Sequence, residues 1–105
     1  MPADRQAVKL HPGAEADLKE SVDFYRAAAG EKLVSRFKQC VADGVETIAA
    51  NPNRGAMLPD MIGVRRLRIK VFPFSLIFIE RADAVWVVAV AHRSRKPGYW
   101  KHRLS

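Results

Sequence analysis

Residues 64–80 read VRRLRIKVFPFSLIFIE, and this stretch decides the fold. From Arg66 to Val71, basic residues alternate with leucine, isoleucine and valine, which is the period-2 pattern of a strand buried on one face. Phe72-Pro73 interrupts the pattern, and residues 74–80 follow as an apolar run of strand length. The stretch therefore predicts two consecutive strands joined by a turn.

A third strand is predicted close behind. Residues 85–92 read VWVVAVAH, which is too apolar for anything but a buried strand, and Ala82-Asp83-Ala84 before them fits a tight hairpin. Strands with such short connections are expected to pair antiparallel. A shorter strand is predicted near the start of the chain, at residues 7–10, where Val8 and Leu10 flank Lys9.

Between these strands the apolar period changes to that of a helix. Apolar residues recur every three or four positions in two stretches, while charged residues such as Asp17 fill the other faces. Gly30 separates the two stretches, and Asn51-Pro52 ends the second, because the residue before a proline leaves the helical region. We expect helices near residues 13–29 and 31–50, folded into an antiparallel hairpin because their join is short.

The predicted fold is α+β with the order β-α-α-β-β-β. A helical hairpin packs on one face of a mainly antiparallel four-stranded sheet, and residues 1–105 form one domain. Leu67, Ile69 and Val71 should face the helices. Their neighbours Arg66, Arg68 and Lys70 are then expected on the opposite, uncovered face. The expected core consists of Leu18, Val22, Phe37, Val41, Ile48, Leu67, Ile69, Ile77 and Val88.

Charge is distributed unevenly along the chain. Residues 1–50 hold seven basic and eight acidic residues, a net charge of −1, while residues 51–105 hold eleven basic and three acidic ones, a net charge of +8. The last fourteen residues, HRSRKPGYWKHRLS, contain no acid. A basic excess concentrated in one half is typical of proteins that bind a polyanion or an acidic partner. The row of Arg66, Arg68 and Lys70 and this terminal segment could border one concave surface.

Such a surface has the parts needed to cleave RNA without a metal. Arginines such as Arg93 and Arg95 bind phosphate, and His92 is the candidate acid or base because histidine titrates near neutral pH. Tyr99 and Trp100 could stack on unpaired bases. Structural roles stay open beside these: Trp100 and Tyr99 as anchors of the C-terminal tail, and His92 as a hydrogen-bonded structural residue.

Other classes of function are disfavoured. A lone Cys40 and scattered histidines offer no metal-ligand spacing, and no glycine-rich phosphate loop occurs, so neither a metal nor a cofactor is expected. No apolar run is long enough to span a membrane, and no signal peptide is visible. The single cysteine fits the reducing cytoplasm, which is the expected location.

The element order, together with VRRLRIKVFPFSLIFIE and with VVAVAHRSRKPGYW at residues 87–100, resembles the RelE/ParE superfamily of bacterial toxins. The resemblance extends from Val8 to Trp100. It implies a growth-inhibiting toxin of a type II toxin–antitoxin system, held inactive in a hetero-oligomer with a cognate antitoxin protein. RelE-like members cut messenger RNA on the ribosome and ParE-like members poison DNA gyrase, so ribosome-bound mRNA and gyrase are the two implied targets.

The two branches imply different roles for the same residues. In a RelE-like toxin, a metal-independent endoribonuclease, Arg66, Arg68, Arg93 and Tyr99 match catalytic positions, and His92 would join them as acid or base. In a ParE-like toxin no intrinsic catalysis is implied. The surface then contacts the target or the antitoxin through Arg66, Arg68, Lys70, Arg93, Arg95, Tyr99 and Trp100.

Two features of the sequence favour the ParE-like branch. The middle arginine of RelE-like toxins is replaced here by Ser75, which removes one phosphate contact. The ending Pro97-Gly98-Tyr99-Trp100 is also more similar to ParE-like sequences. The alternatives are the mRNA endonuclease and a non-toxic basic nucleic-acid-binding module.

Overall fold

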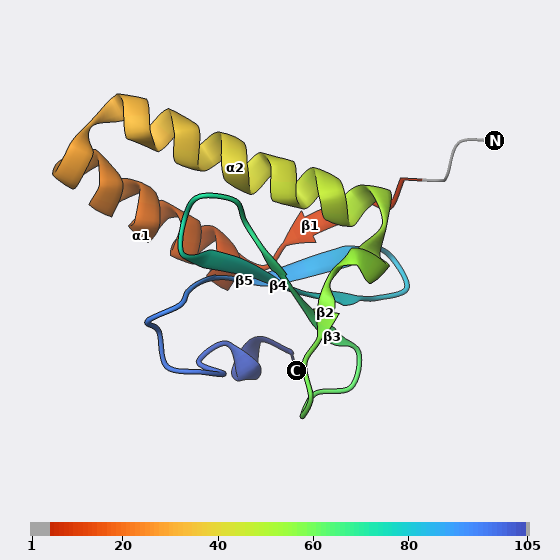
Figure 1. Cartoon of the computed structure of the whole chain (residues 1–105). Helices are drawn as coiled ribbons and strands as arrows, with labels where there is room; N and C mark the ends of the chain where they lie inside the picture. The colour runs from red at the N-terminus through yellow and green to blue at the C-terminus, as the bar shows by residue number, and fades with distance from the viewer. Residues whose placement is uncertain (1–4, 105) are drawn as a thin grey trace.

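The computed structural model describes residues 5–104 (Figure 1). Residues 1–4 and 105, which the predicted domain includes, lie outside the described residues. The elements are β1 (Val8–Leu10), α1 (Pro12–Ala29), α2 (Glu31–Ala50), the 3-10 turn η1 (Pro52–Arg54), β2 (Ala56–Met57), β3 (Val64–Arg68), β4 (Phe74–Glu80), β5 (Val85–His92) and the 3-10 turn η2 (Lys101–Leu104). The predicted order β-α-α-β-β-β is confirmed, with one short strand added.

Local chemistry sets the ends of the helices. Pro12 is the first residue of α1, where its missing N–H costs little, and Nδ1 of His11 accepts a hydrogen bond from the Gly13 N–H at 2.9 Å. Gly30 ends α1 with a φ of +86°, a conformation that glycine adopts without strain. The helix α2 begins at the next residue, so the two helices form the expected antiparallel hairpin.

The sheet has five strands in the described part of the chain, in the order β1-β5-β4-β3-β2. The strands β2 to β5 pair antiparallel, and β1 pairs parallel with β5. The additional strand β2 lies where the sequence predicted a loop. Its two residues pair with Arg65 and Arg66, and a segment that short carries no readable apolar period.

The main core lies between the helical hairpin and the sheet (Figure 1). Seven of the nine predicted core residues are buried, and Leu18 and Leu67 are half-buried against the core. Val71, however, was expected to face the helices and is 72% exposed. The reason is that β3 ends at Arg68, so the turn that follows no longer keeps the strand alternation. Phe72 enters the core instead.

The opposite face of the sheet is only partly open, which corrects the expected uncovered face. After β5 the chain crosses beneath the sheet and ends there (Figure 1). Trp100 is 5% exposed and packs with Val64, Ile77, Val88 and Ala89 in a second apolar cluster. Trp100 therefore has the anchoring role that the sequence left open.

One irregularity in the sheet helps to place the C-terminal segment. Ile77 pairs with Ala89 and Phe78 with Val87, so Val88 is an extra residue in β5. Such a bulge re-aims the backbone groups next to it. The carbonyl of Val88 and the N–H of Val90 are both used by side chains from elsewhere in the chain. No helix in residues 5–104 is both long and apolar enough to cross a membrane.

Candidate functional site: a basic groove under the sheet

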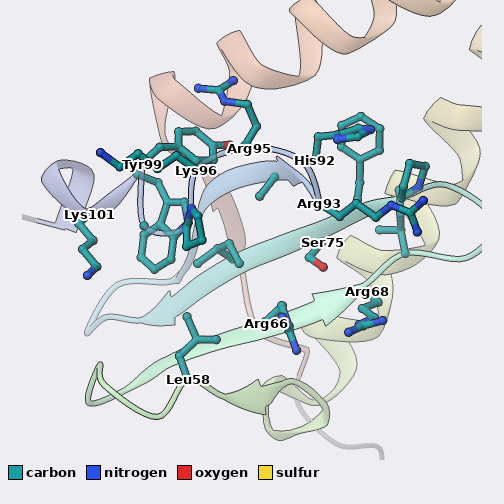
Figure 2. Close-up of a pocket in the computed structure, with 18 of the residues that line it drawn as sticks. Leu58, Arg66, Arg68, Ser75, His92, Arg93, Arg95, Lys96, Tyr99 and Lys101 are labelled. Carbon is teal, nitrogen blue, oxygen red and sulfur yellow. The ribbon is translucent and has the colours of Figure 1, made fainter.

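A groove of about 810 Å³ lies on the face of the sheet that the helices do not cover. Its floor and walls include apolar side chains such as Leu58, Ile77 and Trp100. Its lining in the described residues also carries one carboxylate, Asp60, and the basic residues Arg66, Arg68, Arg93, Arg95, Lys96 and Lys101. We call this the basic groove. Figure 2 shows that its cations come from β3 on one side and from the segment after β5 on the other.

Strand register explains how Arg66 and Arg68 reach the groove. Arg66 lies opposite Ile77 and Arg68 opposite Ser75, and residues directly opposite each other share a face of the sheet. Both arginines are exposed, and in residues 5–104 neither forms an ion pair with a carboxylate. Ser75 lies between Arg68 and Arg93 in Figure 2. The row of cations is therefore interrupted by a neutral hydroxyl.

Lys70 does not belong to this row. It follows the end of β3, is exposed, and is absent from the lining of the groove, so the structure does not bring it into the groove with Arg66 and Arg68. The alternation that suggested it stops where the backbone leaves the strand at Arg68. Lys96 and Lys101, which the sequence did not select as site residues, line the groove from the other side.

The side chain of His92 projects from the face of the sheet that the helices cover. Its partner across the strands is Phe74, whose ring belongs to the core on the helix side, and the two rings meet edge to face at 4.9 Å. Its Nδ1 accepts a hydrogen bond from the Ser94 N–H at 2.9 Å. His92 therefore reaches the rim of the groove while its ring is held by structural contacts.

The loop after β5 carries the remaining predicted cations. The Arg93 N–H donates to the carbonyl of Pro73 at 2.9 Å, which ties this loop to the turn between β3 and β4. The guanidinium of Arg95 lies 4.0 Å from the centre of the Tyr99 ring, a cation–π contact. In Figure 2 Arg95 points toward the helix layer, away from Arg66 and Arg68. The structure thus brings Arg66, Arg68 and Arg93 to one face and places Arg95 at its far rim.

A buried ion pair holds the end of the chain. Asp17 on α1 is 7% exposed, the only buried charged residue in residues 5–104. It accepts two hydrogen bonds from the guanidinium of Arg103, at 2.7 and 3.2 Å, and others from the Tyr99 hydroxyl at 3.0 Å and the Val90 N–H at 3.2 Å. Arg103 also donates to the Val88 carbonyl at 2.9 Å. We call this network, Asp17 with Tyr99, Arg103 and the bulge of β5, the C-terminal clamp.

The clamp changes the acidity of its members. Burial, followed by the Asp17 charge and hydrogen bond, raises the pKa of Tyr99 to about 12. The hydrogen bond to Asp17 raises the pKa of Arg103 further above its ordinary value. At neutral pH Tyr99 therefore keeps its proton, and its hydroxyl donates a hydrogen bond to the Asp17 carboxylate.

Sequence reasoning missed Asp17 and Arg103. Asp17 was assigned to an exposed face of the helix, yet it lies three residues after the fully buried Ala14 and on the same stripe. A carboxylate on the buried stripe of a helix indicates that a cation from another part of the chain pairs with it. Nothing local could identify the cation, because Arg103 lies 86 residues away.

The raised pKa of Tyr99 makes a prediction about alkaline stability. A tyrosine whose pKa rises from 10.0 to about 12 on folding stabilises the fold fully below pH 10. Between pH 10 and 12 the unfolded chain loses this proton first, so the free energy of unfolding should fall. Urea denaturation across this range should show a shallower fall for Tyr99→Phe than for the parent. An equally steep fall in the variant would contradict the assignment.

The fold and the groove define a small basic α+β protein, with a helical hairpin on one face of its sheet and a cationic groove on the other. The chain belongs to the family of ParE toxins of type II toxin–antitoxin systems (parDE), because the sequence model of that family matches residues 8–97. The ParE-like branch favoured by the sequence is thereby confirmed. Tyr99, Trp100 and Arg103 lie beyond the matched residues.

A comparison with solved structures supports the same fold. A chain from the chromosomal ParDE TA system of P. aeruginosa is 24% identical, with a TM-score of 0.73 over 85% of this chain and 97% of that chain. At this identity the likeness shows the fold alone. No curated protein matches the chain.

Proposed function

We propose that this protein inhibits growth by binding DNA gyrase through the basic groove, and that a cognate antitoxin neutralises it. The proposal rests on two observations. Arginine and lysine side chains line the groove, and the candidate proton-transfer groups, Tyr99 and His92, make structural contacts with other residues. The Tyr99 hydroxyl donates to Asp17, and His92 packs against Phe74 at the rim. Phosphodiester cleavage needs a general base and a general acid at the reacting atoms, whereas binding needs only complementary charge and shape.

The aromatic residues favour a protein target over single-stranded RNA. Proteins that bind unpaired bases offer exposed ring faces for stacking. Here Trp100 is 5% exposed, and Arg95 covers the Tyr99 ring. The groove instead combines apolar lining such as Leu58 and Ile77 with surrounding cations. That combination suits an acidic polypeptide segment that inserts an apolar side chain.

The same reasoning describes the antitoxin. Covering Arg66, Arg68 and Arg93 without counter-charges would leave desolvated, unpaired cations, which is costly. We therefore expect the antitoxin, encoded beside this gene, to place Asp or Glu side chains against these arginines in a hetero-oligomer. Co-expression of the neighbouring gene should restore growth, and a product that neither binds nor rescues would contradict this part of the proposal.

Two substitutions separate gyrase binding from RNA cleavage. Tyr99→Phe and His92→Gln should each change gyrase affinity and growth arrest only modestly, because both leave the arginines and lysines of the groove in place and both keep the Asp17–Arg103 ion pair that holds the C-terminal segment. Loss of a general acid or base would instead lower mRNA cleavage by about 10²–10⁴-fold. The assays are binding of purified gyrase, inhibition of its supercoiling activity, and ribosome-dependent mRNA cleavage. Cleavage by the parent that disappears in either variant would replace this proposal with the endonuclease.

A further inference from the structure

We propose that Asp17 is a positioning residue for the toxin's binding site. Through Arg103 and Tyr99 it holds the C-terminal segment, residues 93–104, against the sheet and thereby keeps Arg95 at the rim of the basic groove. The observed hydrogen bonds are by themselves sufficient to infer that Asp17 holds the segment. The role of these contacts in target binding rests on the proposed function.

The geometry makes Asp17 the fixed point of the segment. Its side chain is 7% exposed and that of Arg103 11%, and the two groups meet through two parallel N–H···O contacts. Such bidentate pairing fixes the orientation of the guanidinium as well as its position. Undocking the segment would take away the cation that balances the buried Asp17 charge, so the ion pair favours the docked position of the segment.

A continuous series of contacts leads from Asp17 to the groove. The Tyr99 hydroxyl donates to Asp17 at 3.0 Å, which sets the direction of the ring. Arg95 lies over that ring at 4.0 Å, and Arg103 is 5.2 Å from its centre. Asp17 does not line the basic groove itself, whereas Arg95 and Tyr99 do. Its effect on binding must therefore be transmitted through the segment.

Gly13 shows how closely the clamp is fitted to the start of α1. A Cβ atom added at Gly13 would lie 2.4 Å from Nε of Arg103 and 2.6 Å from its Cζ. The guanidinium donates hydrogen bonds to Asp17 and to the Val88 carbonyl, so it cannot move away without weakening those bonds. Gly13→Ala therefore disturbs the clamp without removing any charge.

The segment can loosen while the rest of the fold persists. Trp100 and its neighbours form an apolar cluster separate from the core between the helices and the sheet. That core is built by residues such as Phe37, Leu76 and Phe78, none of which belongs to the Trp100 cluster. Release of the segment is thus distinguishable from global unfolding.

The experiment uses the full chain with Trp86→Phe, which leaves Trp100 as the sole tryptophan. In this background Asp17→Asn should shift Trp100 emission to the red and speed tryptic cleavage after Arg93 and Arg95, while far-ultraviolet circular dichroism is retained. Gyrase binding should weaken about tenfold or more, the effect of losing one charged contact. Glu15→Gln, an exposed residue of the same helix, makes the same charge change and should leave all of these readouts as in the parent.

Gly13→Ala provides a second test if Asp17→Asn does not fold. Unchanged Trp100 emission in a folded variant would overturn the clamp. A released segment with undiminished gyrase binding would overturn the positioning role. The proposed function would then still be tested separately, by the gyrase binding of the Arg66→Ala and Arg68→Ala variants. Absence of gyrase binding by the parent would overturn the proposed function, and Trp100 emission would still report on the clamp.

Discussion

Replacing Arg103 by leucine is expected to lower the free energy of unfolding by about 3–5 kcal/mol, because removing one partner of a buried ion pair leaves the other charge buried and uncompensated. The Asp17 carboxylate would keep only the Val90 N–H and the Tyr99 hydroxyl as donors. The Val88 carbonyl would also lose its hydrogen bond from Arg103. For a chain of this size the midpoint of thermal unfolding should fall by at least about 12 °C.

The measurement is urea denaturation together with thermal unfolding. Arg36→Leu, an exposed residue of α2 with no ion pair in the described structure, is the matched control and should change stability by less than about 0.5 kcal/mol. The double variant Asp17→Leu, Arg103→Leu should be more stable than Arg103→Leu alone, because it removes the stranded charge. If both arginine variants lost equal stability, the ion pair would not be the reason.

The largest functional effect is expected from Arg66→Ala combined with Arg68→Ala. Each charged hydrogen bond contributes about 1.5–3 kcal/mol, so losing two should weaken gyrase binding by roughly 10²–10⁴-fold. Stability should hardly change, since both side chains are exposed and lack ion pairs in residues 5–104. The readouts are gyrase affinity at two salt concentrations, growth arrest, and the unfolding midpoint.

Lys70→Ala is the matched control for this pair. It removes the same kind of charge from the same part of the chain, but Lys70 lies outside the groove. Binding should therefore weaken little. An equal loss for Lys70→Ala would mean that general positive charge, rather than the groove, attracts the target. A double arginine variant that arrests growth as strongly as the parent would remove the basic groove from the mechanism.

Much of this fold could be predicted because its elements are defined by local patterns. The helical hairpin follows from a 3.6-residue apolar period interrupted at Gly30, and the three antiparallel strands follow from a period of two with short turns. These patterns depend only on residues close together in the sequence. They also predicted that Arg66 and Arg68 lie on the face of the sheet away from the helices. They did not predict that Val71 is exposed or that Lys70 lies outside the groove, because periodicity does not reveal the residue at which a strand ends.

The site required the tertiary structure. The sequence showed that the second half of the chain is basic, and with its resemblance it indicated the toxin family. It could not show that His92 turns to the helix face, since that depends on its register with Phe74. Nor could it show that the Tyr99 hydroxyl donates a hydrogen bond to Asp17. Asp17 and Arg103 are joined only when α1, the bulge of β5 and the end of the chain meet, and side chains so distant in sequence share no local pattern.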